Sequence, residues 1–463
     1  MATICTSNLT SGFIDLATYD EQEKYMYGGD DATAYFVRET RKATWFTQVP
    51  VCLSRSSGTP EFGQEWSVTI SRAGDYLLYC WLRVTIPSVQ LNISNSNGGA
   101  DARLRWTRNL AHNLVRECCI TFNDLVAARF DNYHLDFWSA FTVPAGKVNG
   151  YNNMIGNFDD LIQPHDSFTP IESVTLNLPI PLFFTRDSGV ALPTAAIPYN
   201  DMRISFAFRQ WNQLLIIDDS SPVAGTNPSK APLSSDLVGG IPSISSAQVW
   251  ANYAIVSNDE RKRMACAPRD ILIEQVQTAP IQSFNPSQSL RPTYDIRFSH
   301  AIKVIFFGVR NRTTDPDWSN YTAASPVPQA SLVDFSPSGA VDPIVQTSII
   351  YENTQRLYQM GSDYFSLVQP YYHAPVIPLN TGYHMYSYSL DFIALDPMGS
   401  TNFGKLTNVS ILPEPSVGAQ TGAAGTGALG TGQDYVQTYD FIVTVVNNNT
   451  IRISGGALGF PVL

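Results

Sequence analysis

The sequence carries little charge, and that charge is spread thinly. Only 15% of the 463 residues are charged, the formal net charge is −11, and no block of Lys and Arg stands out anywhere along the chain. Proteins that bind phosphate backbones need clustered cations, so direct nucleic-acid binding is not expected. A diffuse excess of acid mainly keeps a protein soluble.

Long apolar runs and cysteine motifs are also missing. No stretch approaches the length of a membrane span, and residues 1–7 have neither the basic nor the apolar region of a signal peptide. We therefore expect a soluble protein made in the cytosol. The six cysteines form no Cys-x-x-Cys pair and are predicted to be free, buried thiols: Cys5, Cys52, Cys80, Cys118, Cys119 and Cys266.

The residue patterns of common active sites are absent as well. The motif Gly425-Thr-Gly427-Ala-Leu-Gly430 fits G-x-G-x-x-G, but it lacks the strand before it and the helix after it that a phosphate site needs. No G-x-S-x-G elbow occurs, and we predict no catalytic residue, no cofactor, no cofactor-binding residue and no metal ligand. The histidines are scattered without an H-x-H or H-E-x-x-H pair: His112, His134, His165, His300, His373 and His384.

Several remaining polar groups have plain structural interpretations. The pairs Asp159-Asp160 and Asp218-Asp219 are expected in solvated loops, because adjacent carboxylates rarely converge on one bond. Arg186-Asp187 is expected to make a local ion pair or turn contact, and His300 a hydrogen bond at a strand end. The Asn-x-Ser/Thr sequons are expected to carry no sugar: Asn8, Asn92, Asn311, Asn320, Asn408 and Asn448.

Turn formers and aromatic residues are plentiful. The chain has 30 Pro, 30 Gly and 12% aromatic residues, which is typical of a loop-rich β protein. Residues 202–208 alternate, with Met202, Ile204, Phe206 and Phe208 on one face, and this predicts a half-buried strand. Residues 76–86 predict a longer strand whose buried face is shared by Tyr76, Leu78, Cys80, Leu82, Val84 and Ile86.

A weak internal repeat divides the chain. Residues 120–124 (Ile-Thr-Phe-Asn-Asp) recur 229 residues later at 349–353 (Ile-Ile-Tyr-Glu-Asn), and each copy precedes a helical segment, at 131–142 and 362–373. Each half offers about eight short strands. The predicted fold class is therefore all-β, with two tandem eight-stranded antiparallel jelly rolls, short helices and long loops.

Two helix-start signals set the predicted domain boundaries. Thr18 with Glu21 fits a capping box for a helix to about Tyr27, within an N-terminal arm at 1–29. Ser257 with Glu260 fits a second box, in a helical connector at 257–270. The first roll is expected at 30–256 and the second at 271–463. The apolar C-terminus, residues 460–463, is expected to be buried.

The central block Leu182-Phe-Phe-Thr-Arg-Asp-Ser-Gly-Val-Ala-Leu-Pro193, with Pro198-Tyr-Asn-Asp-Met-Arg-Ile204 after it, resembles the signature of the major capsid proteins of large icosahedral cytoplasmic DNA viruses. The iridovirus form, especially that of the invertebrate iridescent viruses, is the most similar. Blocks along most of the chain carry the same resemblance, among them Ser11-Gly-Phe-Ile-Asp-Leu, Phe62-Gly-Gln-Glu-Trp-Ser, Arg297-Phe-Ser-His and Asp396-Pro-Met-Gly-Ser-Thr-Asn.

The resemblance implies a non-enzymatic structural protein of the virion, assembled in the host cytoplasm. It implies two jelly rolls per chain and homotrimeric, pseudo-hexagonal capsomers that tile an icosahedral shell over an internal membrane. The implied partners are the chain itself, neighbouring capsomers and minor capsid proteins, with the N-terminal arm on the inward side near the membrane.

Three other interpretations compete with this one. A two-domain jelly-roll lectin would be expected to show an acidic calcium cluster, and a glycosidase two loop carboxylates facing a groove. Neither can be assembled from the sequence. A minor capsid or spike subunit would not be expected to match the major-protein blocks from end to end.

Overall fold

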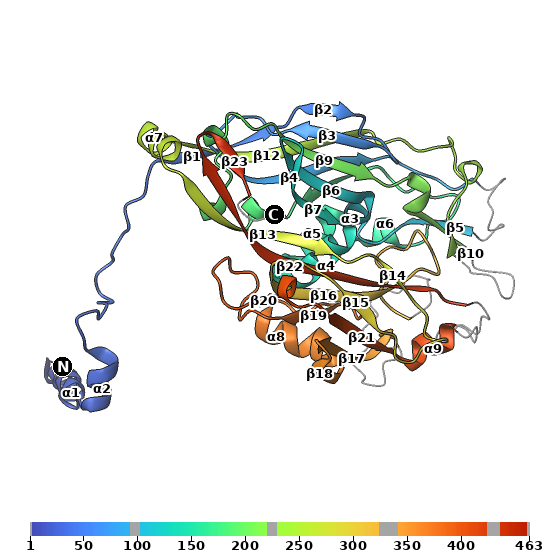
Figure 1. Cartoon of the computed structure of the whole chain (residues 1–463). Helices are drawn as coiled ribbons and strands as arrows, with labels where there is room; N and C mark the ends of the chain where they lie inside the picture. The colour runs from blue at the N-terminus through green and yellow to red at the C-terminus, as the bar shows by residue number, and fades with distance from the viewer. Residues whose placement is uncertain (1, 93–101, 220–228, 324–340, 424–435, 461–463) are drawn as a thin grey trace. The chain divides into compact units, whose positions relative to one another are not determined.

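The computed structural model describes residues 2–92, 102–219, 229–323, 341–423 and 436–460 (Figure 1). Its contacts divide the chain into two compact units, Met1–Trp45 and Phe46–Leu463. The G-x-G-x-x-G stretch at 425–430 lies outside the described residues.

The smaller unit contains two helices, α1 (Ala2–Ala17) and α2 (Glu21–Tyr27). The predicted capping box at Thr18 is wrong. Asp20 is the N-cap of α2, and its carboxylate accepts a hydrogen bond from the Glu21 amide at 2.8 Å. Thr18 instead donates its hydroxyl to the Asp15 carbonyl at the end of α1.

The first jelly roll is built from two main antiparallel sheets. One has the order β1-β12-β4-β8 and the other β2-β3-β9-β6-β7, with a small sheet β11-β10-β5 beside them. The strands are β1 (Phe46–Cys52), β2 (Arg55–Gly58), β3 (Glu65–Thr69), β4 (Tyr76–Ile86), β5 (Ala102–Trp106), β6 (Val115–Phe122), β7 (Leu125–Asp131), β8 (Val174–Pro179), β9 (Met202–Phe208), β10 (Leu215–Asp219), β11 (Ser229–Lys230) and β12 (Ser246–Val256).

The second jelly roll repeats this topology. The order β13-β22-β16-β19 matches the first sheet of roll one, and β15-β21-β17-β18 matches β3-β9-β6-β7. The all-β, double jelly-roll prediction is thus confirmed. The strands are β13 (Arg269–Thr278), β14 (Gln282–Phe284), β15 (Tyr294–Ile296), β16 (Ala301–Asn311), β17 (Ile344–Tyr351), β18 (Thr354–Gly361), β19 (His384–Ser387), β20 (Thr401–Asn402), β21 (Val409–Pro415), β22 (Tyr439–Ser454) and β23 (Ala457–Gly459).

Helices fill the connections between the strands. The α-helices are α3 (Leu110–Leu114), α4 (Asn132–Thr142), α5 (Val148–Ile155), α6 (Asp159–Ile162), α7 (Asn258–Cys266), α8 (Gln369–His373) and α9 (Val417–Ala423). The π-helix η7 (Tyr364–Val368) leads into α8, and the 3-10 turns are η1 (Ala145–Lys147), η2 (Phe183–Thr185), η3 (Ser188–Val190), η4 (Thr194–Ala196), η5 (Trp211–Gln213), η6 (Ser234–Asp236) and η8 (Phe403–Lys405). Ser257 precedes α7 as predicted, but its side chain makes no capping hydrogen bond.

The repeat lies in one β-hairpin of each roll. Strands β6 and β17 begin 229 residues apart, at Val115 and Ile344, and β7 and β18 do the same. Both turns place their two central residues at positive φ, with 50° and 63° at 123–124 and 45° and 64° at 352–353, as a two-residue hairpin turn of the primed type requires. Outside this hairpin the spacing between matching strands changes, because the connecting loops differ in length.

The predicted face of β4 holds for only part of the strand. From Cys80 to Ile86 alternate residues are buried as predicted, but before Cys80 the buried residue is Leu77 rather than Leu78. Tyr79 pairs with Asn252 and Leu77 with Tyr253, so Leu78 is the extra residue of a β-bulge. A bulge reverses the alternation, and sequence periodicity cannot anticipate it.

The first core takes side chains from both ends of the second half. Ile273 of β13, Ile451 and Ile453 of β22 and Leu458 of β23 belong to it, and Phe460 packs against it half-buried. Residues 461–463 of the expected apolar terminus lie outside the described part of the chain. The predicted boundaries at 29, 256 and 270 stay predictions, although burial does not divide there.

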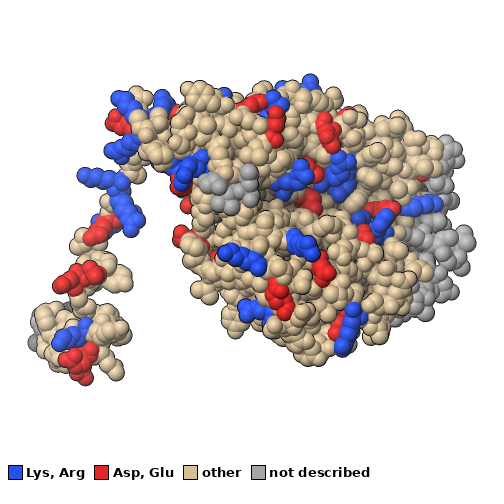
Figure 2. Space-filling view, viewed as in Figure 1, with Lys and Arg blue, Asp and Glu red and all other residues tan. Residues whose placement is uncertain are grey.

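Charge on the larger unit is mixed. Figure 2 shows Lys and Arg interspersed with Asp and Glu on the face that it draws. No helix among the described residues is long and apolar enough to cross a membrane.

Candidate functional site

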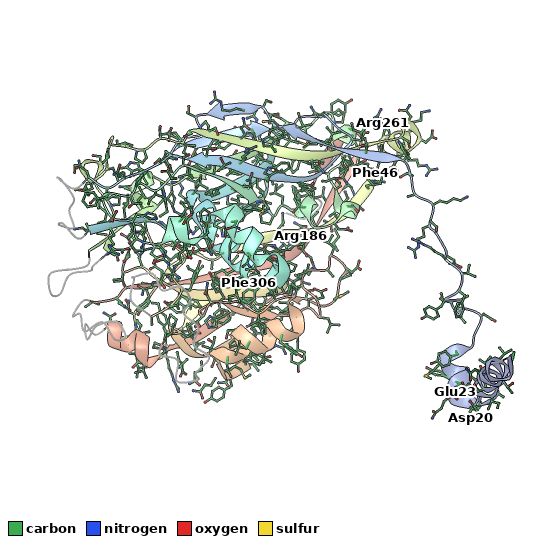
Figure 3. The ribbon with its side chains drawn as sticks, turned by 180° about the vertical axis from the view of Figure 1, so that it is seen from behind. Asp20, Glu23, Phe46, Arg186, Arg261 and Phe306 are labelled. Carbon is green, nitrogen blue, oxygen red and sulfur yellow. The ribbon has the colours of Figure 1, made fainter. Side chains whose placement is uncertain are left out.

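Helix α4 of the first roll packs on the outer face of a sheet of the second roll. Its side chains Tyr133, Phe137 and Phe141 recur every four residues and so form one stripe. This stripe meets the outward residues of β16, β19 and β22 in a buried cluster that includes Val304, Phe306, Met385, Ile442 and Val446. Phe306 stacks on Phe141 with ring centroids 5.4 Å apart, and Figure 3 labels it at this junction.

A buried carboxylate fixes the polar end of this junction. Asp136 of α4 is 1% exposed. One of its oxygens lies 2.7 Å from His112 Nδ1 and accepts from Asn109 at 3.1 Å. The other accepts from Ser319 at 2.8 Å and from Tyr321 at 3.0 Å. An ionised carboxylate only accepts hydrogen bonds, so four donors, two from each half of the chain, satisfy its charge.

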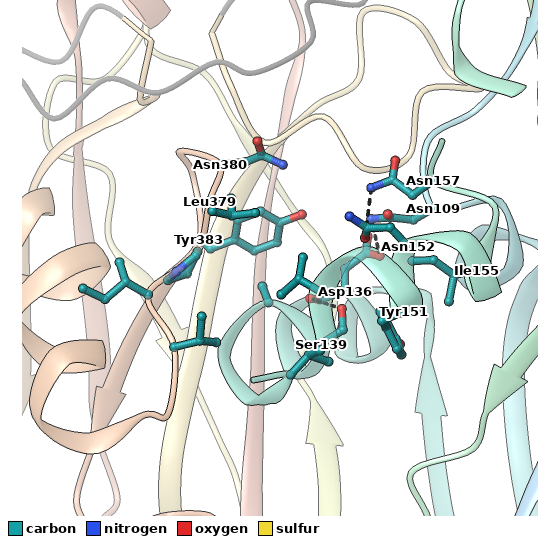
Figure 4. Close-up of a pocket in the computed structure, with 16 residues that line it drawn as sticks. Asn109, Asp136, Ser139, Tyr151, Asn152, Ile155, Asn157, Leu379, Asn380 and Tyr383 are labelled. Atoms are coloured by element: carbon teal, nitrogen blue, oxygen red, sulfur yellow. Dashed lines mark hydrogen bonds between the residues drawn. The ribbon is translucent and has the colours of Figure 1, made fainter. Parts of the chain in front are cut away.

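The same carboxylate belongs to a relay of side chains beside a small pocket. His112 Nε2 lies 2.7 Å from the Tyr151 hydroxyl, which gives the order Tyr151, His112, Asp136. A pocket of about 90 Å³ opens here (Figure 4), lined by Ser139, Tyr151 and Tyr383 among others. Burial, with the charge of Asp136, raises the pKa of Tyr151, so the phenol stays protonated and is a donor rather than a nucleophile.

A second buried charge cluster joins the rolls. Glu274 of β13 lies 3.0 Å from Arg186 Nε and 2.5 Å from Lys303 Nζ, and all three side chains are almost fully buried. The Arg186 guanidinium also lies 3.6 Å from the centre of the Trp138 ring. The expected local pair between Arg186 and Asp187 is therefore wrong, because the guanidinium turns inward to a carboxylate of the other half.

Trp318 completes the junction between two guanidinium groups. Arg209 lies 3.7 Å from one point over its ring and Arg310 lies 3.9 Å away. Burial lowers the pKa of Arg209 to about 10, so this group still carries its charge at neutral pH. Cation–π contacts of this kind, removed from water, contribute about 2 kcal/mol. The junction is thus built for rigidity.

The structure brings two predicted histidines to carboxylates and leaves the others apart. His112 meets Asp136, and His384 Nε2 lies 2.9 Å from Asp342 inside the second roll. His134 is buried without a hydrogen-bond partner, and His165 and His373 lie within hydrogen-bond distance of backbone carbonyls. His300, expected at a strand end, precedes β16 at φ 64°, and its carbonyl accepts from Phe403.

The carboxylate pairs have different outcomes. Asp159 and Asp160 are exposed at the start of α6. Asp218, expected in a solvated loop, is instead buried in β10, where Arg105 Nε contacts it at 2.6 Å. This expectation was wrong because Arg105 lies 113 residues away in sequence and only the pairing of β5 with β10 brings it close.

No part of the described chain forms a metal site of three or more His, Cys, Asp or Glu side chains. The described cysteines are free, and burial raises the pKa of Cys80 to about 12. Cys52 and Cys266 are exposed, which corrects the prediction that every thiol is buried. Two sequon residues, Asn311 and Asn320, are buried in the folded chain, which leaves no room for a sugar there.

Comparison with known families places this junction in context. Residues 260–459 match the family model described as large eukaryotic DNA virus major capsid protein, and residues 34–256 match major capsid protein N-terminus. The chain belongs to this family. The fold and the family together account for a junction that is rigid and has no catalytic groups, since the family is a structural one.

Relatives agree along the whole chain. The chain is 63% identical to the major capsid protein of Costelytra zealandica iridescent virus, covering 99% of both chains. It is 44% identical to that of Frog virus 3, covering 100% of both. Among solved structures, PBCV-1 VP54 has a TM-score of 0.71 at 20% identity, over 93% of this chain and 100% of that one, which bears on the fold alone.

Proposed function

We propose that this protein is the major structural subunit of an icosahedral virion and that it self-assembles into homotrimeric, pseudo-hexagonal capsomers. One observation carries the proposal. A single chain holds two jelly rolls with the same strand order, so three chains offer six similar rolls around one ring. Closed rings of this kind are built from heterologous contacts between identical chains.

The junction between the rolls supports this role. Aromatic burial under α4 and the Asp136 and Glu274 clusters fix one roll against the other. Interiors packed in this way are stiff. A stiff pair of rolls keeps the angle between neighbours constant, which a ring of defined size needs.

The remaining partners follow from the arm and the domain plan. We divide the chain into an arm at 1–29, a first roll at 30–256, a connector at 257–270 and a second roll at 271–463. The arm leaves Leu9, Phe13, Ile14 and Leu16 exposed within its own unit. We assign it to the inward side of the shell, with minor capsid proteins and the internal membrane as its neighbours. Particles are built in the host cytoplasm, without direct contact with nucleic acid.

The test combines native mass and imaging. Purified protein at micromolar concentration is expected to have three times the mass of the 51.1 kDa chain. Each interface is expected to exceed the ~2,000 Å² typical of obligate assemblies. Electron micrographs are expected to show hexagonal capsomers. A strictly monomeric protein that does not assemble on crowding or on a change of salt would contradict the proposal.

A further inference from the structure

Each roll carries a helix at the same place in its topology. Helix α4 connects β7 to β8 in the first roll, and the η7–α8 helix connects β18 to β19 in the second. These strand pairs correspond, because β18 and β19 occupy the positions of β7 and β8 in the repeated sheet orders. The two helices are therefore equivalent parts of the two rolls.

The two helices differ in what covers them. The stripe of α4 is buried on the outer face of the sheet of β16, β19 and β22. The matching face of η7–α8 is bare, with Val368 40%, Tyr371 70% and Tyr372 72% exposed. Their spacing of three and four residues puts them on one side of the helix. An apolar stripe of this kind has no cover within its own chain.

The sheets show the same difference. The outer face of the second roll's sheet lies under α4, with Phe306 and Met385 fully buried. The equivalent outer face of the first roll, on β4 and β12, carries Tyr79, Trp81 and Trp250. Trp81 stacks on Trp250 at 6.3 Å, and Tyr79 is 48% exposed. A largely apolar groove of about 520 Å³ runs along Tyr79 and Trp81, beside Pro179 and Met154.

We infer that the Val368–Tyr371–Tyr372 stripe of one copy docks on the Tyr79–Trp81–Trp250 face of a second copy. This inference rests on the proposed homotrimer and specifies its interface. The occupant follows from the chain itself: the contact between the first and second rolls inside one chain is repeated between the second roll and the next chain's first roll. Because the two patches differ, the contact is heterologous and continues from copy to copy until the ring closes.

Charge substitutions test both sides of the contact. Trp250→Glu and Tyr372→Glu are each expected to abolish the trimer at concentrations where the unmodified protein is fully trimeric, with an unchanged unfolding temperature. Phe168→Glu is the matched control, since Phe168 is 78% exposed outside both patches, and it is expected to stay trimeric. The double variant Trp250→Lys with Tyr372→Glu is expected to recover trimers.

Mixing the two single variants gives a sharper result. Each retains one intact patch, so the mixture is expected to form a heterodimer of twice the chain mass, with no closed trimer. If Trp250→Glu does not fold, Tyr372→Glu carries the test, because its ring is largely exposed. Variants that remain trimeric would overturn this interface and leave the proposed function in place, as would trimers that fail only in shell assembly. An unmodified protein that is itself monomeric would instead count against the proposed function.

Discussion

Asp136 accepts hydrogen bonds from Asn109, His112, Ser319 and Tyr321, and these donors come from both halves of the chain. Asp136→Ala leaves the donors buried without an acceptor. Breaking a buried charged network typically costs 3–5 kcal/mol, so we expect a loss of about that size in the free energy of unfolding, measured by denaturant titration. Asp159→Ala, at an exposed carboxylate, is the control and should stay within about 0.5 kcal/mol.

His134 gives the fold a pH dependence of known sign. Burial, with the nearby charge of Arg186, lowers its pKa from 6.5 to about 3. Between these values the unfolded chain binds a proton that the folded chain does not, so stability falls as the pH drops from 6.5 towards 3, by up to ~1.4 kcal/mol per unit from this group. His134→Gln should flatten the slope of unfolding free energy against pH. His165→Gln, near the surface, should not. An unchanged slope in the first variant would contradict the assignment.

At the scale of elements, the hairpin turns offer a stabilising change. Asp124 sits at φ 63° with its side chain exposed, and glycine adopts this conformation without strain. Asp124→Gly is expected to raise the free energy of unfolding by about 0.5–1 kcal/mol. Asp124→Val, with a β-branched side chain, is expected to lower it by about 1 kcal/mol or more. Thermal unfolding of both variants checks the order, and a reversed order would show that the turn is not of this type.

Elements also show how far the sequence leads. Alternation over 202–208 predicts β9 correctly, and the repeat at 120–124 and 349–353 finds the matching hairpins, because both signals are local. The pairings Asp136–His112 and Arg186–Glu274 were missed, since their members lie on separate elements that only tertiary packing brings together. The bulge at Leu78 was missed for a related reason. It is defined by the partner strand β12 and leaves no mark in the periodicity of β4.

At the scale of the whole molecule, the arm is the part that can be removed. The contacts separate residues 1–45 from the rest of the chain. Deleting residues 2–27 is therefore expected to leave folded trimers, seen as an unchanged mass and unfolding temperature, while it impairs their attachment in the shell. If the deletion unfolds the isolated subunit, the arm belongs to the core and its assignment to the inward side is wrong.

The end of the chain has a consequence for the order in which the molecule is made. Ile451, Ile453 and Leu458 complete the core of the first roll, and Asn200 holds the final hairpin by accepting from the Leu458 amide at 3.1 Å. During translation the first half leaves the ribosome long before these residues exist, so its core must wait open. A chain stopped at residue 448 is expected to show fast amide exchange around Ile273, whereas the complete chain protects it. Only a finished polypeptide can then present finished surfaces, so prematurely terminated chains are kept out of the shell by their own incomplete folding.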